Sequence, residues 1–564
     1  MPKLIDIFCE RRGITTDYMA EINSSACDTL MDIDEAADFL RDACKSRQRL
    51  VVIPDFDMDG IMSGVVGYAG FSELCFNTAL FIPNPSMGYG LSVAEADRLM
   101  REYPDTKYAV TCDVGISEYD GIARLKDYGV KILLTDHHKQ IKRTKADVTV
   151  DPMRVDETYL HPEICGAYVL WKCIYHYANK YGSVFQREQI ERLKVFAGIG
   201  TISDAMPVLY ENRRLVRDAI AICKFIFSEG DEVTVNSLPG CNEYRRAFRG
   251  LYDVLVIFWQ EGKISGSEDI DETFFGYYLA PVFNSVKRMN YDMAWAFGAF
   301  FGSDRIKCIN MLLTLNENRK ALVKDCMETL LNTEQPYAPF IYTGDVPLGI
   351  AGLVASKLMD MTGLPTLVLS QNNDGDFVGS GRSPEWYPFI AHTKDCNGIG
   401  ARGHEGAFGA FVDSDKMTDV YSFLKNSVMT IFEALPDDVV GDDNYDILIS
   451  TLGDGDIDID VSAFRSFLKA VRIYKPFGRG FPSPVITFKF RASDCVRRVF
   501  GRTRSHVAFE FGQGFVAYAW NQSDVKTDDI IVLKGNLSFN DYNGVDFIIF
   551  TGDIQEGVPL CEKE

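Results

Sequence analysis

The alternation of short apolar runs with helix-like segments, from about residue 49 to residue 210, is the feature that most restricts the fold. Runs such as "RLVVIP", "KYAVTC", "VKILLT" and "DVTV" each end in polar or charged residues. Strands that alternate with helices predict a parallel sheet. Because ligands of such sheets collect at the carboxyl ends of the strands, the functional residues are expected where the apolar runs stop.

Carboxylates and imidazoles gather at those predicted strand ends. The first run is followed by Asp55, Asp57 and Asp59, at alternate positions. Alternate residues of an extended segment point the same way, so the three acids can converge on one point. The other strand-end residues are Asp113, Asp136, His137, His138 and Asp204.

Unpaired acids in such a cluster would repel one another, and their pKa values would rise until some of them became neutral. Divalent cations remove this conflict, and carboxylates with imidazole suit Mg²⁺ or Mn²⁺. Taken singly, the DxDxD pattern also suits a solvated loop or a calcium site, and "DHH" a surface turn. The presence of acids or histidines at four predicted strand ends, namely the DxDxD pattern, Asp113, "DHH" and Asp204, together predicts a metal centre.

Composition narrows the class of protein. The formal net charge of −22 over 564 residues argues against a protein that coats nucleic acid by bulk charge. It does not exclude a nucleic-acid enzyme, because clustered metal-binding acids contribute to that balance. Fourteen cysteines without a CxxC pair suit reduced thiols in a cytosol. No apolar run is long enough to span a bilayer, so we expect a cytoplasmic protein without membrane attachment.

The rest of the chain reads as three further parts. A mostly helical stretch suits a connector, and a second, shorter α/β stretch follows it. The last part alternates short strands at a spacing that suggests a small barrel such as an OB-fold. The predicted division is a catalytic domain at 1–230, a helical connector at 231–330, a substrate-binding domain at 331–435 and a nucleic-acid-binding barrel at 436–564.

The motifs "DFDMDG", "CDVG", "TDHH" and "GTISDAMP", in this order, resemble those of the DHH phosphoesterase superfamily. "PNPSMGYGLS", "CGAYVL" and "APVFNSVKRM" resemble its RecJ branch of single-strand-specific 5′→3′ exonucleases, and "PFGRGFPSPV" resembles the start of the RecJ-type OB-fold. The resemblance implies an α/β fold, with a parallel-sheet DHH domain, a helical connector, a smaller α/β DHH-associated domain and a C-terminal β-barrel. The chain departs from the family pattern at Val346, Pro347 and Arg402.

The resemblance also implies roles for the clustered residues. Asp113 would bridge two divalent ions, with Asp55 and Asp57 on one ion. Asp59, His137 and Asp204 would bind the other. His138 would donate to a phosphate oxygen, and Asp136 would orient a neighbouring imidazole.

Substrate contacts are expected from three places. "GSGRS" and "RGHEGAFG", which resemble parts of the DHH-associated domain, offer an arginine that can fork a phosphate and a glycine-rich backbone that can approach an anion closely. A basic, aromatic stretch of the predicted OB-fold, which has no acid within it, suits phosphate neutralisation and base stacking. The predicted substrate-binding residues in these places are Ser380, Arg382, Ser383, His404, Arg497, Arg498, Arg502 and Arg504, and Arg288 of "APVFNSVKRM" is predicted in addition.

The leading hypothesis is a two-metal 5′→3′ exonuclease that degrades single-stranded DNA to 5′-mononucleotides in recombination and repair. One alternative is a DHH-type phosphodiesterase of short oligonucleotides or cyclic dinucleotides, against which the C-terminal barrel argues. The other is a non-catalytic replication scaffold derived from a nuclease, against which the full set of predicted metal ligands argues. By family resemblance the chain would be a monomer that works with a single-strand-binding protein or a RecQ-type helicase.

Overall fold

The structure is a computed structural model, and its chain divides into two compact units. The larger unit is Ser25–Leu435, and the smaller unit combines Met1–Ser24 with Pro436–Glu564. The first 24 residues, which the sequence-based division placed in the catalytic domain, therefore group with the C-terminal strands. The residues that the structure describes are 3–24, 29–87, 90–230, 238–434, 445–500, 506–512, 514–519, 522, 530–542 and 545–554.

The larger unit begins with a five-stranded parallel sheet in the order β2-β1-β3-β4-β5, as the alternating pattern predicts. Its strands are β1 (Arg49–Pro54), β2 (Thr78–Leu80), β3 (Thr106–Cys112), β4 (Lys131–Thr135) and β5 (Val148–Val150). The helices around it are α3 (Ile33–Ser46), α4 (Met58–Glu73), α5 (Val93–Glu102), α6 (Tyr119–Asp127), α7 (Gly166–Tyr181), α8 (Val184–Arg192), α9 (Lys194–Ser203) and α10 (Tyr210–Glu229).

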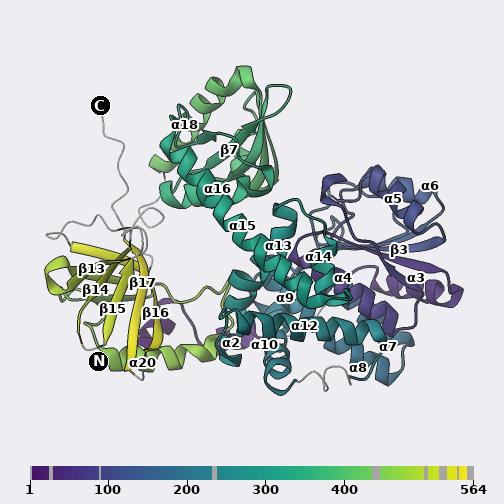
Figure 1. Cartoon of the computed structure of the whole chain (residues 1–564), viewed down its shortest axis with the longest axis horizontal. Helices are drawn as coiled ribbons and strands as arrows, with labels where there is room; N and C mark the ends of the chain where they lie inside the picture. Colours follow the sequence, from purple (N-terminus) through teal and green to yellow (C-terminus); the bar gives the residue numbers. More distant parts are fainter. Residues whose placement is uncertain are drawn as a thin grey trace. The chain divides into compact units, whose positions relative to one another are not determined.

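Helices cover both faces of this sheet because successive residues of an interior strand, β1, point in opposite directions. Leu50 and Val52 belong to the large core that includes α3, α4 and α7. Val51 and Ile53 belong to a separate core formed with α5 and α6. Figure 1 shows the sheet between these two groups of helices. A strand buried on both faces reads as a continuous apolar run, and β1 does.

The segment after this domain is mostly helical, as predicted. It contains α12 (Asn242–Gln260), a π-helical turn η3 (Phe274–Leu279), α13 (Ala280–Arg288), α14 (Ala294–Phe301) and α15 (Arg305–Asn332). Although α15 has 28 residues, it buries only one side, at positions such as Ile309, Leu312 and Leu315. In the part of the chain that the structure describes, no helix has the length and apolar character needed to cross a bilayer.

A second, mixed sheet completes the larger unit, in the order β6-β7-β8-β10-β9. Its first two strands are parallel and are joined by helix α16, and the other neighbours are antiparallel. The elements are β6 (Ile341–Thr343), α16 (Leu348–Thr362), β7 (Thr366–Gln371), β8 (Phe377–Arg382), α17 (Phe389–Thr393), β9 (Ile399–His404), β10 (Ala407–Val412) and α18 (Met417–Ala434).

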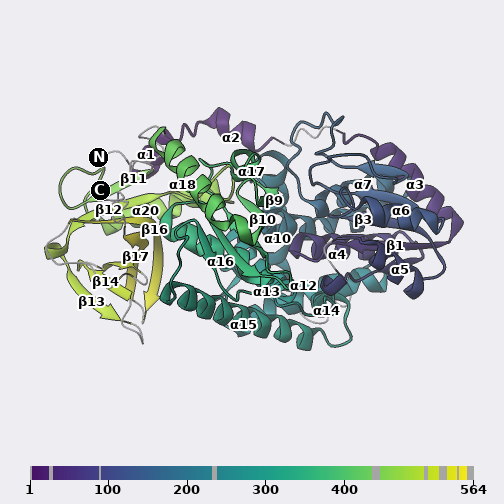
Figure 2. The same ribbon diagram turned by 90° about the horizontal axis from the view of Figure 1, so that it is seen from above.

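The smaller unit has a seven-stranded sheet with α20 (Val461–Ala470) against it (Figure 2). The order is β11-β12-β16-β17-β15-β14-β13, so among the described residues no pairing of the two edge strands closes it into a barrel. The N-terminal helix α1 (Leu4–Arg11) is tied to it by Arg11, whose guanidinium lies 2.6 Å from Asp456. The strands are β11 (Ile447–Ser450), β12 (Ile486–Arg491), β13 (Val496–Phe500), β14 (His506–Glu510), β15 (Phe515–Ala519), β16 (Ile530–Tyr542) and β17 (Val545–Ile554), and the other N-terminal helix is α2 (Thr16–Ile22).

Candidate metal centre and substrate contacts

The three acids after β1 occupy the junction between this strand and helix α4. Asp55 follows the strand, and Asp57 is the N-cap of the helix, where its Oδ1 accepts a hydrogen bond from Gly60 N at 3.1 Å. Asp59 lies in the first helical turn and accepts hydrogen bonds from Gly166 N at 2.7 Å and Ala167 N at 3.3 Å. Those two amides begin α7, so the positive end of that helix faces the Asp59 carboxylate.

Asp113 follows β3 and stands at the centre of the cluster. Its φ of 65° lies in the left-handed region, a conformation that costs a residue with a Cβ on the order of 1–3 kcal/mol. Its Oδ1 lies 3.0 Å from His137 Nε2, and the residue is 2% exposed. Such strain persists where the surrounding structure requires the side chain in one place.

The Asp136-His137-His138 triplet follows β4 and divides into a supporting acid and two imidazoles. Asp136 is buried, and its Oδ1 accepts from His137 N at 2.8 Å and lies 2.8 Å from His138 Nδ1. Its Oδ2 accepts from Ile116 N at 2.9 Å. With both oxygens occupied, Asp136 positions His138, the role that the sequence predicts for it.

The predicted ligands come together in overlapping groups. In one group, Asp55, Asp57 and Asp113 offer oxygens within 4.8 Å of one another. In a second, two carboxylate oxygens of Asp59 and Asp204 and a ring nitrogen of His137 lie within the same distance, and a third group joins Asp113 to His137 and His138. The partition into two ion sites around Asp113 remains a proposal, and this grouping of ligand atoms supports it.

Two details of the geometry differ from the sequence-based expectation. The three acids after β1 do not converge along an extended segment, because helix α4 begins at Met58 and brings Asp59 round by its first turn. Asp204 does not end a strand; it is the C-cap of helix α9. The apolar run before Asp204 is a buried helix of 10 residues, and a buried helix resembles a buried strand in hydrophobicity alone.

Burial and mutual repulsion make the acids poor anions without a cation. Burial, and then the charge of Asp57, raise the pKa of Asp55 and of Asp59 to about 7. Burial, and then the neighbouring carboxylates, raise the pKa of Asp113 and of Asp204 well above their usual range. Divalent cations reverse this balance, because they favour the ionised carboxylates.

The two adjacent histidines have opposite protonation tendencies. Burial, and then the charge of His138, lower the pKa of His137 to about 4, so its imidazole is neutral and suited to a metal. Burial opposes charge on His138 too, but the hydrogen bond and charge of Asp136 prevail and raise its pKa to about 10. His138 therefore carries a proton at neutral pH and can donate it in a hydrogen bond to a phosphate oxygen.

The residues present fit divalent cations. Asp113 Oδ1 is buried, accepts no hydrogen bond within the described residues, and faces the Nε2 atom of a neutral imidazole. Two such lone-pair atoms at 3.0 Å repel each other unless a cation or a proton lies between them. Carboxylate oxygens with imidazole nitrogen are a donor set for Mn²⁺ or Mg²⁺.

Stability of the metal-free protein should depend on pH through these acids. In the folded state the pKa values of Asp55 and Asp59 are raised to about 7, above their unfolded values. Their contribution to stability is therefore greatest at low pH and is lost as the pH rises through about 7. We expect Mn²⁺ to raise the melting temperature more at pH 8 than at about pH 5.5. Calorimetry with EDTA or Mn²⁺ measures this, and an equal increase at both pH values would contradict it.

Glycines make room for the acids. A Cβ on Gly200 would lie 2.2 Å from Asp59 Oδ1, and a Cβ on Gly166 would lie 2.5 Å from Asp113 Oδ1. The Gly200→Ala variant should therefore displace the Asp59 carboxylate and weaken Mn²⁺ binding roughly 10- to 100-fold. Isothermal titration with Mn²⁺ measures the affinity. Gly70→Ala is the matched control, because its Cβ would meet nothing closer than 3.4 Å.

Three arginines gather beside the cluster. Burial, and then the charges of Arg319 and Arg382, lower the pKa of Arg288 to about 10, and Asp57 opposes this. Glycines of α16 allow the approach: a Cβ on Gly352 would lie 2.7 Å from a terminal nitrogen of Arg382. Arg319 on α15 was missed in the sequence, because it lies outside every recognised motif. Guanidinium groups that repel one another beside a metal centre suit a phosphate.

The second sheet presents some of its predicted substrate residues on one face. On β10, Ala407 pairs with both Arg382 and His404, and Gly409 pairs with Ser380. Directly opposed residues of antiparallel strands share a face, and Ala407 and Gly409 lie on the exposed one. Ser383 is different: its hydroxyl is buried and donates to the Tyr387 carbonyl at 2.6 Å. The proposed substrate contacts of this sheet are therefore those of Ser380, Arg382 and His404.

The predicted arginines of the C-terminal unit are only partly described. Arg502 and Arg504 lie outside the described residues. Arg497 and Arg498 lie on β13. No acid lies within this basic stretch of the sequence, but the sheet brings Glu510 of the adjacent strand β14 to 3.1 Å from Arg498. Their contact with nucleic acid remains a prediction.

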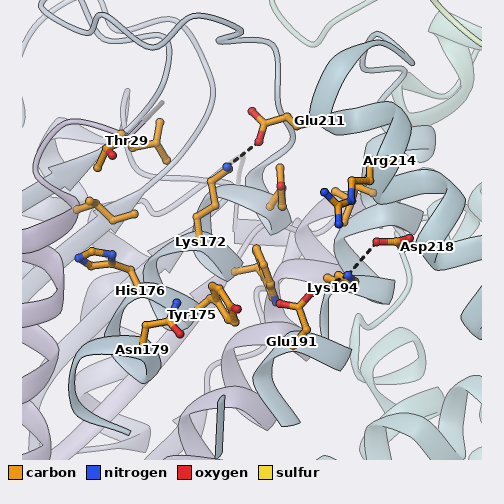
Figure 3. A pocket seen from close by; sticks show the side chains of 15 residues that line it. Thr29, Lys172, Tyr175, His176, Asn179, Glu191, Lys194, Glu211, Arg214 and Asp218 are labelled. Carbon is orange, nitrogen blue, oxygen red and sulfur yellow. Dashed lines mark hydrogen bonds and ion pairs between the residues drawn. The ribbon is translucent and has the colours of Figure 1, made fainter. Parts of the chain in front are cut away.

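A pocket of about 370 Å³ between α7, α10 and Thr29 contains none of the predicted site residues (Figure 3). Its lysines are engaged: Lys172 lies 2.6 Å from Glu211, and Lys194 lies 2.8 Å from Asp218. Tyr175 stacks on Trp171 in its wall, with ring centres 4.7 Å apart. Since acids neutralise these lysines, the pocket is a weaker phosphate site than the three arginines.

Two family models match the chain. Residues 49–198 match the DHH family, N-terminal domain, and residues 454–550 match the RecJ OB domain. The first match contains every predicted metal ligand except Asp204, and the second contains β12 to β16.

Relatives align over most of the chain. The single-stranded-DNA-specific exonuclease RecJ of Haemophilus influenzae is 23% identical over 91% of this chain and 89% of its own length. The protein of that name from Thermus thermophilus is 23% identical over 91% of this chain and 69% of its own.

Solved structures share the fold. The crystal structure of Thermus thermophilus RecJ with Mn²⁺ matches with a TM-score of 0.71 at 18% identity, over 98% of this chain and 76% of that one. With matches to a DHH N-terminal domain and to a RecJ OB domain, and with RecJ relatives that align along most of its length, the chain is similar to RecJ-type proteins of the DHH family.

Proposed function

We propose that the protein is a metal-dependent exonuclease that hydrolyses single-stranded DNA from its 5′ end to 5′-mononucleotides, in recombination and repair. The observation that carries the proposal is the pair of ligand groups that share Asp113, beside a cluster of three arginines. The relatives named single-stranded-DNA-specific exonuclease support the substrate. The match to the RecJ OB domain favours a long strand over a dinucleotide.

The residues divide the work of hydrolysis. Asp55, Asp57, Asp59, His137 and Asp204, with Asp113 between them, would hold two divalent ions, which when bound activate a water and stabilise the leaving oxygen. Protonated His138, held by Asp136, donates to a phosphate oxygen. Arg288, Arg319 and Arg382 neutralise the phosphates next to the scissile bond, and Ser380 and His404 extend this contact along the exposed sheet face.

The arginine cluster gives a physical basis for the 5′ polarity. A terminal 5′-phosphate carries more charge than an internal phosphodiester, so a group of mutually repelling guanidiniums favours it. Beside the metal centre, such a group would place the first phosphodiester of the strand at the acids. The free thiols of the described cysteines suit a cytoplasmic location, and we propose a monomer that works with a single-strand-binding protein or a RecQ-type helicase.

The experiment uses the full chain with Mn²⁺ and a single strand of about 50 nucleotides, which is several times longer than the stretch that one OB domain binds. The label is at the 5′ end in one sample and at the 3′ end in another. The proposal predicts that the 5′ label appears at once as a mononucleotide while the 3′-labelled strand shortens gradually. Survival of the long strand with loss of short oligonucleotides would favour the phosphodiesterase alternative, and binding without cleavage would favour the scaffold.

A further inference from the structure

Two adjacent tyrosines are exposed on the π-helical turn η3, directly before α13. The exposed fractions of Tyr277 and Tyr278 are 80% and 43%, whereas Phe274 and Phe275 of the same turn are buried. Within the described residues, neither tyrosine ring packs against another ring. Single exposed apolar side chains are common on protein surfaces, whereas two adjacent exposed aromatic rings are less common. π-Helical turns are frequently found at functional sites.

The turn adjoins the metal centre. A Cβ on Gly276 would lie 3.4 Å from Cγ2 of Ile202, which is two residues before Asp204 on α9. The turn η3 packs against α9, and α13 packs against α4, the helix whose first turn follows Asp57 and carries Asp59; Figure 1 shows α13 and α4 in the same part of the larger unit. The turn that carries the two tyrosines therefore packs against a helix that ends in a predicted metal ligand.

One face of the helix joins the tyrosines to the acids. The residues of α13 that are not buried are Pro281, Asn284, Lys287 and Arg288, at the spacing of a single helical stripe that begins with Tyr277 and Tyr278. Midway along this stripe, Asn284 Oδ1 accepts a hydrogen bond from Met58 N at 2.7 Å. Lys287 Nζ lies 4.1 Å from the centre of the Phe56 ring. In the sequence, Phe56 stands between the predicted metal ligands Asp55 and Asp57.

The chemistry of this stripe suits a single-stranded nucleic acid. It has two aromatic faces at one end and two cations, Lys287 and Arg288, at the end beside the metal centre. Proteins hold single strands without reading sequence by stacking bases on aromatic rings and neutralising the backbone with cations. A protein partner would not require these cations to continue into a hydrolytic centre.

We propose that Tyr277 and Tyr278 form a stacking platform for bases of the single strand whose scissile phosphate lies at the metal centre. The platform rests on the proposed function for the identity of its substrate. From Tyr277 to Arg288 the helix rises on the order of 16 Å. Because the tyrosines lie that far from the cations beside the metal centre, the platform acts only on strands that extend beyond the scissile bond. Tyr277 and Tyr278 are thus positioning residues.

The first test compares long and short substrates. The Tyr277→Ala/Tyr278→Ala double variant should raise KM for a strand of about 20 nucleotides roughly 10- to 100-fold, since stacking contributes about 1–3 kcal/mol per base. Its kcat and its hydrolysis of a dinucleotide, which is too short to reach the platform, should not change. The Tyr277→Phe/Tyr278→Phe variant keeps the rings and should restore the KM. Phe225→Ala on α10 removes another exposed ring, 65% exposed, as a matched control.

A second test removes the bases instead of the rings. An abasic nucleotide at successive positions from the 5′ end should weaken wild-type binding only over a short run of neighbouring positions. In the double variant, the affinity should not depend on the position of the abasic nucleotide, because the rings on which the bases would stack are already absent. Fluorescence anisotropy with Ca²⁺ in place of Mn²⁺ measures binding without turnover.

The outcomes separate the platform from the proposed function. Unchanged binding of the ~20-nucleotide strand by the double variant would overturn the platform, whether or not the wild type cleaves it. Equal losses on the strand and on the dinucleotide would also overturn it, because the tyrosines would then act on the metal centre. Loss of binding by the variant, with a wild type that binds but does not cleave, would support the platform and reject the exonuclease.

Discussion

Replacing Asp113 with asparagine is expected to lower kcat for strand hydrolysis by about 1,000-fold or more. Asp113 belongs to two of the three ligand groups, and its Oδ1 lies 3.0 Å from His137 of the third, so the substitution should weaken both predicted ion sites at once. Asparagine has nearly the same shape and also tolerates the left-handed φ of 65° at this position, so the fold should persist. Steady-state kinetics with Mn²⁺ measure the loss, and circular dichroism checks the fold.

The Asp113→Asn variant should also melt at a higher temperature than the wild type in EDTA. The substitution removes a buried carboxylate whose pKa is raised well above its usual range by burial and by neighbouring acids. Asp120→Ala, which removes an exposed acid near the start of α6, is the control and should change neither quantity. If Asp113→Asn kept most of the wild-type kcat, the assignment of the cluster as the reaction centre would be wrong.

The Arg288→Met variant is expected to bind strands more weakly and to be more stable when free. Burial, and then the charges of Arg319 and Arg382, disfavour the charged form of Arg288 in the folded protein. Methionine keeps the length of the side chain and removes that repulsion, so the melting temperature without DNA should rise. Loss of charged hydrogen bonds to phosphate should raise KM roughly 10- to 100-fold, and most for 5′-phosphorylated strands.

An arginine with a purely structural role would behave differently. Arg249 lies 2.8 Å from Asp253, so Arg249→Met leaves that buried acid with one fewer cation and should lower the melting temperature without changing KM. Differential scanning fluorimetry and kinetics on strands with and without a 5′-phosphate measure both quantities. If Arg288→Met lowered stability and left the preference for 5′-phosphate intact, the arginines would hold the fold and not the substrate.

Most of the fold could be predicted because its strands are buried on both faces. A strand such as β1, with Leu50 and Val52 in one core and Val51 and Ile53 in another, leaves an apolar run that ends abruptly in polar residues. The placement of residues 1–24 with the C-terminal strands could not be predicted in this way. That grouping depends on ion pairs such as Arg12 with Asp446, between residues far apart in the sequence.

The clustering of the metal-site residues could be predicted more fully than their geometry. Parallel strands end at one edge, so Asp55, Asp113 and Asp136 had to lie near one another. The helical position of Asp59 and the glycines that admit the acids depend on packing between elements. Arg319 carries no local signal, because its proximity to Arg288 arises from two helices that meet in space. Ser383 shows the converse: its motif suggested a substrate contact, whereas in the structure its buried hydroxyl donates to the Tyr387 carbonyl.

The most direct test of the central claim, that cations hold the buried acids, is an anomalous diffraction measurement on crystals grown with Mn²⁺. Two peaks, on either side of Asp113 and roughly 4 Å apart, are expected, one near Asp55 and Asp57 and the other near Asp59, His137 and Asp204. A crystal saturated with Mn²⁺ that shows no peak at these acids, or a single peak that does not touch Asp113, would contradict the account.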